Sequence, residues 1–186
     1  RGRKPGIKAL ILTPTRELAI QIGESFTAYG RYTHVKHTVI FGGVGQKPQT
    51  DALERGVDVL IATPGRLLDL INQGFIRLDT LEYFVLDEAD RMLDMGFYDD
   101  IMQIVKFLPK ERQTIMFSAT MPAKIQQLAQ NILHNPAEVK LAVSKPAEKI
   151  VQAAYICYEN QKLGIIRSLF AEQTPERVII FASSKL

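Results

Sequence analysis

Short apolar runs alternate with helix-like patterns along almost the whole chain, and this alternation restricts the possible folds more than any other feature. The apolar runs indicate buried strands and are, in chain order, Ala9–Leu12, Val35–Phe41, Val57–Ala62, Leu81–Leu86, Thr114–Phe117, Val151–Cys157 and Val178–Phe181. The clearest helical pattern covers Pro122–Leu133, and two others cover Tyr98–Val105 and Leu163–Phe170. Such alternation predicts an α/β fold, with helices on both faces of a parallel sheet.

The alternation is interrupted at residues 142–149, which are polar and have no periodic pattern. We interpret them as an interdomain linker between a first domain at residues 1–141 and the beginning of a second at residues 150–186. The second segment is too short to fold alone. The chain begins without Met and stops after a strand-like run, so we expect it to be a piece of a longer protein.

The net charge of +3 is too small to indicate a nucleic-acid partner, but the charges are unevenly distributed. Residues 1–40 carry seven Lys or Arg and two acids, whereas residues 79–100 carry eight acids and only Arg91 as a cation. This predicts separate anion-binding and cation-binding regions, with a solvated acidic face as the alternative. A single Cys157 excludes an internal disulfide and favours a reducing, cytoplasmic location. No apolar stretch approaches the ~18 residues of a membrane span, so no membrane partner is expected.

Two strand ends carry groups that suit nucleotide hydrolysis. Asp87-Glu88-Ala89-Asp90 follows the run 81–86 directly, and ligands of open α/β sheets bind at the carboxyl ends of strands. One carboxylate can hold Mg²⁺ while another positions the attacking water. Ser118-Ala119-Thr120 follows the next run, where hydroxyl groups can bond a neighbouring carboxylate or, alternatively, cap the next helix.

The usual phosphate-binding loop, Gly-x-x-x-x-Gly-Lys-Ser/Thr, is absent from this sequence. The segment Gly42-Gly43-Val44-Gly45-Gln46-Lys47 does not match it, because Gln46 precedes Lys47 and Pro48 follows. Two interpretations remain: a plain turn, or a backbone surface that a phosphodiester can approach closely.

Two strand-to-helix junctions share one design, namely Thr13-Pro14-Thr15-Arg16 and Thr63-Pro64-Gly65-Arg66. In each, a Thr suited to cap a helix is followed by Pro at the expected first helical position, with Arg in the first turn. The helix dipole disfavours a cation there, and a bound phosphate would resolve the conflict. The alternative is an Arg bonded to Glu17 or Asp69. Two such junctions at one sheet edge favour phosphate.

Together these motifs resemble the DEAD-box ATP-dependent RNA helicases over the whole chain. The motifs occur in the family's order and are Pro14-Thr15-Arg16-Glu17-Leu18, Gly42-Gly43, Thr63-Pro64-Gly65-Arg66, Asp87-Glu88-Ala89-Asp90 and Ser118-Ala119-Thr120. Residues 178–181 with Ser183-Ser184 resemble the first motif of the family's second domain, with Ser184 where Thr is usual. Residues 86–97 and the linker are most similar to the bacterial RhlE-type branch.

The resemblance implies a pair of RecA-like domains that bind ATP in their cleft and single-stranded RNA on one side. Asp87 would hold Mg²⁺, mostly through water, and Glu88 would polarise the hydrolytic water. Asp90, Ser118 and Thr120 would link the nucleotide state to domain closure. The residues that would contact the RNA sugar-phosphate backbone are Pro14, Thr15, Arg16, Gly42, Gly43, Thr63, Pro64, Gly65, Arg66 and Ser184. Such contacts carry no sequence information, so RNA binding should be sequence-independent.

The family's adenine-reading segment and phosphate-binding loop belong before residue 1, and its arginine fingers belong after residue 186. We therefore expect the 186-residue chain alone to be inactive as an ATPase. One alternative is a non-catalytic RNA-binding or partner-docking module that keeps the fold. Another is a DNA translocase of the wider superfamily, although Ala89 and the Ser-Ala-Thr motif favour RNA by resemblance.

Overall fold

The computed structural model describes residues 6–141, 150–151, 153–172 and 176–181. The chain forms two compact units, Arg1–Ala137 and Glu138–Leu186, which are described separately.

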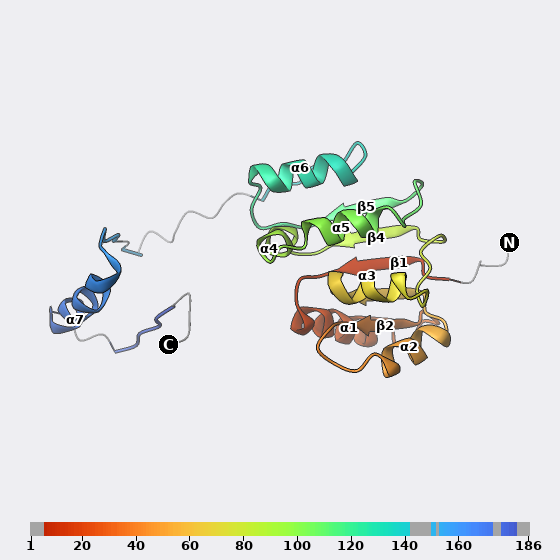
Figure 1. The fold of residues 1–186 in the computed structure, drawn as a ribbon, viewed down its shortest axis with the longest axis horizontal. Coiled ribbons are helices and arrows are strands. Elements are labelled where there is room, and N and C mark those ends of the chain that lie inside the picture. The colour runs from red at the N-terminus through yellow and green to blue at the C-terminus, as the bar shows by residue number, and fades with distance from the viewer. Residues whose placement is uncertain (1–5, 142–149, 152, 173–175, 182–186) are drawn as a thin grey trace. The chain divides into compact units, whose positions relative to one another are not determined.

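The first unit is built on a five-stranded parallel sheet with the order β2-β3-β1-β4-β5 (Figure 1). The strands are β1 Ala9–Leu12, β2 His37–Ile40, β3 Val59–Ala62, β4 Tyr83–Leu86 and β5 Gln113–Met116. The helices are α1 Arg16–Gly30, α2 Lys47–Glu54, α3 Pro64–Asn72, α4 Ala89–Asp94, α5 Tyr98–Val105 and α6 Ala123–Ile132. The predicted parallel α/β architecture is confirmed, and each of these strands lies within or one residue from its predicted run.

Helices cover both faces of the sheet because successive strand residues point to opposite sides. Leu60 and Phe84 belong to the larger buried cluster, which includes side chains from α3, α4, α5 and α6. Ile61 belongs to the smaller cluster on the other face, where Ala19 of α1 packs. This two-sided burial explains why the strands are almost continuously apolar.

All five strands end in one register row. Ile40 pairs with Ala62, Ala62 with Leu12, Leu12 with Leu86, and Leu86 with Met116. Because the strands are parallel, the segments that follow them all leave the sheet at the same edge. This edge holds every predicted site residue that the structure describes.

In the second unit the described residues contain a 3₁₀ turn at Glu159–Gln161 and helix α7, Lys162–Glu172, which includes the predicted helical pattern. The runs predicted as strands at residues 151–157 and 178–181 form no strand where they are described, so that prediction is wrong. A strand requires a hydrogen-bonded neighbour, and an apolar run does not supply one. Residues 142–149 and Ser184 lie outside the described residues. No helix that the structure describes is long and apolar enough to span a bilayer.

Candidate functional site

The residues that follow the strands continue the hydrogen-bonded row by one position. Thr63 donates its backbone N–H to Ile40, Thr13 to Ala62, Asp87 to Leu12 and Phe117 to Leu86, at 2.8–3.1 Å. These bonds fix where the acidic segment after β4 and the two junctions after β1 and β3 begin. The predicted motifs therefore share one rigid edge, with the carboxylates toward β5 and the arginines toward β2.

The two junctions differ in how their helices begin. Helix α3 begins as predicted, with Thr63 at the N-cap and Pro64 as its first residue, although the Thr63 side chain makes no capping hydrogen bond. Helix α1 instead begins after Thr15, whose Oγ1 accepts the Leu18 N–H at 3.3 Å. The predicted cap at Thr13 is therefore wrong, because the backbone of Thr13 still pairs with β3. Thr13 is buried, and its Oγ1 is the one buried side-chain oxygen without a hydrogen-bond partner among the described residues.

The acidic segment after β4 contains a strained residue. Glu88 has φ 51° and ψ 52°, a left-handed conformation that costs a non-glycine residue about 1–2 kcal/mol. Its carboxylate pairs with Arg91, with 3.2 Å between Oε2 and Nη1. Strain of this kind persists where surrounding structure imposes it, often at functional sites. Here the left-handed residue is the N-cap of α4, at the point where the chain passes from β4 into that helix.

The pKa values of Asp87 and Asp90 are shifted in opposite directions. Partial burial raises the pKa of the Asp87 carboxyl above its ordinary value; a hydrogen bond from the Glu88 backbone opposes this and the Glu88 charge adds to it. Burial would also raise the pKa of Asp90, but hydrogen bonds from Thr120 and the Arg91 backbone outweigh it and lower that pKa. Both carboxylates are thus partly desolvated, and they differ because the donors from Thr120 and Arg91 outweigh this effect at Asp90, whereas the Glu88 backbone does not outweigh it at Asp87.

The Ser118-Ala119-Thr120 segment contacts the acidic segment directly, as predicted from its position. Thr120 donates both its hydroxyl and its backbone N–H to Asp90 Oδ2, at 2.8 and 3.0 Å. Ser118 donates its hydroxyl to the Thr120 carbonyl at 2.7 Å, which fixes the turn. Neither hydroxyl caps α6, which begins after Pro122 without a side-chain cap.

The chemistry of the donor set fits Mg²⁺. This ion takes oxygen ligands, keeps several waters, and is usually bound through one or two carboxylates together with substrate phosphates. Asp87 and Glu88 supply such carboxylates at the sheet edge. Within the described ranges, no three or more His, Cys, Asp or Glu side chains are grouped to hold a metal ion. A magnesium ion here would therefore depend on water and phosphate oxygens as well.

The glycine segment after β2 is tied to Arg66. The Arg66 side chain is only 12% exposed, and its Nη2 donates to the Val44 carbonyl at 2.9 Å while Nη1 donates to Gln49 Oε1 at 3.2 Å. Its Nε lies 3.9 Å from Asp69 Oδ2, so the carboxylate contact considered as the alternative to phosphate is also present. Gly43 has φ +78°, and a Cβ added at Gly42 would meet no atom within 4 Å. Arg66 thus holds the exposed glycine turn against the start of α3.

Arg16 is exposed, and its guanidinium carbon lies 5.0 Å from the centroid of the Phe41 ring, which places a cation over an aromatic face. Phe41 and Gln49 were not among the predicted site residues. No short motif contains them, because their contacts join α1, the end of β2, α2 and α3.

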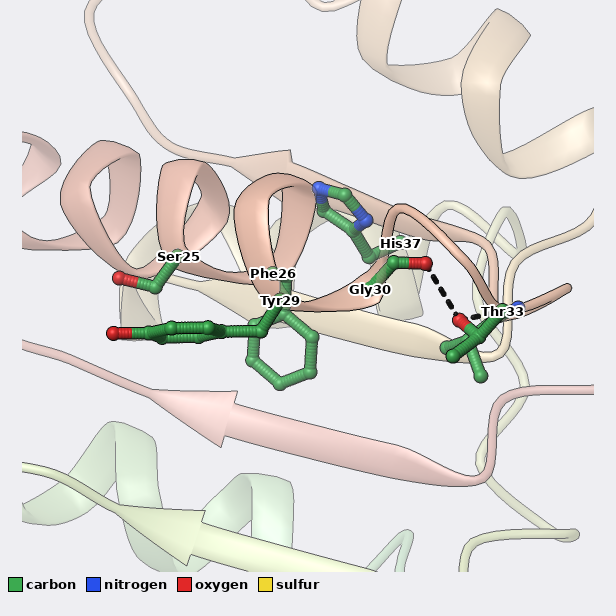
Figure 2. Close-up of a pocket in the computed structure, with 7 residues that line it drawn as sticks. Ser25, Phe26, Tyr29, Gly30, Thr33 and His37 are labelled. Carbon is green, nitrogen blue, oxygen red and sulfur yellow. Dashed lines mark hydrogen bonds between the residues drawn. The ribbon is translucent and has the colours of Figure 1, made fainter.

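One apolar pocket lies away from this edge (Figure 2). It has a volume of about 300 Å³ and is lined by residues between the end of α1 and the start of β2, including Phe26, Tyr29, Val35 and His37. None of its lining residues is a predicted site residue. Because it lies at the amino end of β2, it is separate from the carboxyl edge that holds the motifs.

Comparison with known proteins identifies relatives along most of the chain. The family model described as DEAD/DEAH box helicase matches residues 1–128. The chain is 42% identical over 185 residues to the ATP-dependent RNA helicase DBP2 of Eremothecium gossypii, covering 97% of this chain and 33% of the relative. It is 42% identical over 180 residues to the DEAD-box ATP-dependent RNA helicase RhpA of Helicobacter pylori, covering 96% and 37%. It is 40% identical over 181 residues to the ATP-dependent RNA helicase RhlB of Shewanella amazonensis, covering 96% and 41%. The chain therefore spans between a third and about two fifths of these relatives' lengths.

Proposed function

The chain belongs to the DEAD/DEAH box helicase family, and we propose that it carries the hydrolytic carboxylates and much of the RNA-binding surface of an ATP-dependent RNA helicase. The observation that carries the proposal is the common edge at which the five strands end. There the acidic segment after β4 and the arginine-bearing junctions after β1 and β3 stand side by side in one register row.

On the nucleotide side, Asp87 would hold Mg²⁺, mostly through water, and Glu88 would position and polarise the water that attacks the terminal phosphate of ATP. The bound ion would neutralise charge on the phosphate oxygens. Asp87 suits this role because its carboxylate is partly desolvated and not fully satisfied by protein donors. Asp90, Ser118 and Thr120 would transmit the nucleotide state, since they join the segments after β4 and β5.

On the RNA side, the backbone of a single strand would lie across Thr15, Arg16, Gly42, Gly43 and the segment 63–66. Arg16 is exposed, so a phosphate can reach its guanidinium from solvent, and the glycines have no side chain to block a close approach. Pro14 and Pro64 would shape the two junctions. The role of Ser184 rests on the resemblance alone.

We further infer that residues 1–141 and 150–186 belong to two RecA-like domains joined by residues 142–149. A free Cys157 is compatible with a reducing, cytoplasmic location. Membership of the RhlE-type branch stays a prediction.

Arg16→Ala tests the RNA surface. Fluorescence anisotropy with labelled oligouridine and oligoadenine, at several salt concentrations, would measure affinity and its salt dependence. We expect similar losses for both RNAs, and a slope of log affinity against log salt that is smaller by about 0.7. Arg77→Ala is the matched control, since this exposed Arg pairs with Asp79 before β4, at the opposite edge. Equal affinity and slope for Arg16→Ala and the control would contradict the proposed RNA surface.

A further inference from the structure

Gln49 is a buried polar residue, 8% exposed, near the start of the short helix α2, where its neighbours Lys47 and Pro48 are exposed. Its amide forms a two-way pair with the backbone of Phe41: Nε2 donates to the Phe41 carbonyl at 3.1 Å, and Oε1 accepts the Phe41 N–H at 3.2 Å. Phe41 is the first residue after β2. Strand β2 lies at the edge of the sheet and has a neighbouring strand on one side only. Just past its end, the Gln49 side chain forms the two hydrogen bonds that a second neighbouring strand would otherwise form with Phe41.

The same Oε1 also accepts Nη1 of Arg66 at 3.2 Å, and Arg66 continues to the Val44 carbonyl at 2.9 Å. The ring of Phe41 also lies under the guanidinium of Arg16. One side chain thus links the backbone beneath Arg16, the guanidinium of Arg66 and, through Arg66, the turn that contains Gly42 and Gly43.

We propose that Gln49 is a positioning residue for RNA binding, which holds both arginines and the glycine turn in one fixed arrangement before RNA arrives. The inference rests on the proposed RNA surface and deepens it. Pre-organised groups lose less conformational freedom on binding, so a preset arrangement raises affinity without adding a contact to the ligand.

The requirement for glutamine follows from hydrogen bonding. The site needs one donor for the Phe41 carbonyl and one acceptor for both the Phe41 N–H and Arg66, and an amide supplies both. An ionised Glu keeps the acceptor and loses the donor. Met has nearly the same length and loses both, which leaves the partly buried backbone groups of Phe41 without their partner in Gln49.

The test compares Gln49→Met, Gln49→Glu and the control Thr50→Val. Thr50 is the next residue in α2, is equally buried at 4% exposed, and donates its hydroxyl to the Lys47 carbonyl within the helix. The control therefore removes a buried hydrogen bond from the same helix without touching Phe41 or Arg66. Binding of labelled oligouridine is measured by anisotropy below each variant's melting temperature, and the Gly43 amide is followed by NMR.

We expect Gln49→Met to weaken RNA binding about tenfold, the size of one lost charge-assisted contact, and Thr50→Val to leave it unchanged. The Gly43 amide should shift or exchange faster only in the Gln49 variants. In an Arg66→Ala background, Gln49→Met should weaken binding further by less than about twofold, because coupled residues are not additive. Gln49→Glu should fall between wild type and Gln49→Met.

Wild-type affinity in folded Gln49→Met, or full additivity with Arg66→Ala, would overturn the positioning role. Loss of the fold in both Gln49 variants would also overturn it, since Gln49 would then serve the fold itself. If Arg16→Ala and Arg66→Ala weaken binding while Gln49→Met does not, this inference alone fails. If the wild-type chain and all variants fail to bind RNA, the proposed function fails.

Discussion

Thr120 donates two hydrogen bonds to a single oxygen of Asp90, from its hydroxyl at 2.8 Å and from its backbone N–H at 3.0 Å. Asp90 lies in the first turn of α4 and Thr120 lies beyond the end of β5, thirty residues later. This pair therefore fixes the segment after β4 against the segment after β5. A movement of one of these segments would therefore move the other.

Thr120→Val should keep the backbone bond to Asp90 and remove the hydroxyl bond. We expect the free energy of unfolding at pH 7 to fall by about 1 kcal/mol, because the lost bond goes to a carboxylate at a largely exposed site. The pKa of Asp90 is lowered in the folded state, so its contribution to stability is present above the unfolded value near pH ~3.9 and is lost as pH falls through the folded pKa. The difference between wild type and variant should therefore shrink in acid. Urea unfolding of wild type and variant at pH 7 and in acid measures this difference in the free energy of unfolding. A difference that is independent of pH would contradict the hydrogen bond between the Thr120 hydroxyl and the ionised Asp90.

Asp87→Asn should raise the melting temperature at pH 7. The pKa of Asp87 is raised in the folded state, so the folded chain binds a proton more tightly than the unfolded chain does. Stability therefore falls as pH rises from the unfolded pKa through the folded pKa, and the ionised carboxylate costs stability at neutral pH. Calorimetry at pH 7 and in acid should find the gain only at pH 7. Asp99→Asn is the control: it removes an exposed acid from the first turn of α5 and should lower stability slightly.

Glu88→Gly and Glu88→Ala separate backbone strain from chemistry. Because Glu88 adopts a left-handed conformation, we expect the Gly variant to be more stable than the Ala variant by about 1 kcal/mol.

Neither variant of Glu88 keeps a carboxylate. In an ATP-hydrolysing protein that contains this chain, both variants and Glu88→Gln should slow hydrolysis roughly 10²- to 10⁴-fold, the usual size of acid–base assistance. Phosphate release measures the rate, and a wild-type rate in Glu88→Gln would exclude Glu88 as the group that activates water.

Gly42→Ala tests whether RNA approaches the glycine turn closely. A Cβ at Gly42 would meet no atom within 4 Å and its φ is not in the left-handed region, so stability should be unchanged. If a phosphodiester lies against this backbone, the added methyl group should weaken RNA binding several-fold. Gly45→Ala, which is equally open and lies in the same loop, is the matched control. Equal affinities for the two variants would remove Gly42 from the RNA surface. Gly43→Ala is unsuitable as a control because its φ is +78°.

The sheet could be predicted from the sequence because burial on both faces makes its strands apolar over several consecutive residues. The same reasoning was wrong at residues 151–157 and 178–181, which are apolar yet form no strand where described. It was also wrong about the cap of α1. Thr13 and Thr15 both suit an N-cap, and the pairing of Thr13 with β3 is a tertiary contact that decides between them.

The sequence alone determined the parallel α/β architecture and the order of the motifs, because periodicity and strand-end chemistry are local properties. Only the tertiary structure decided which of these groups are already bonded to each other. The pairs Asp90–Thr120, Arg66–Val44 and Gln49–Phe41 join different elements, and the strain at Glu88 is imposed by its surroundings. Side chains such as Gln49 carry no local signal of such a role, because a polar residue on a short helix is usually solvated. The fold places Gln49 beside the end of the edge strand β2, where the backbone of Phe41 is its hydrogen-bond partner instead of water.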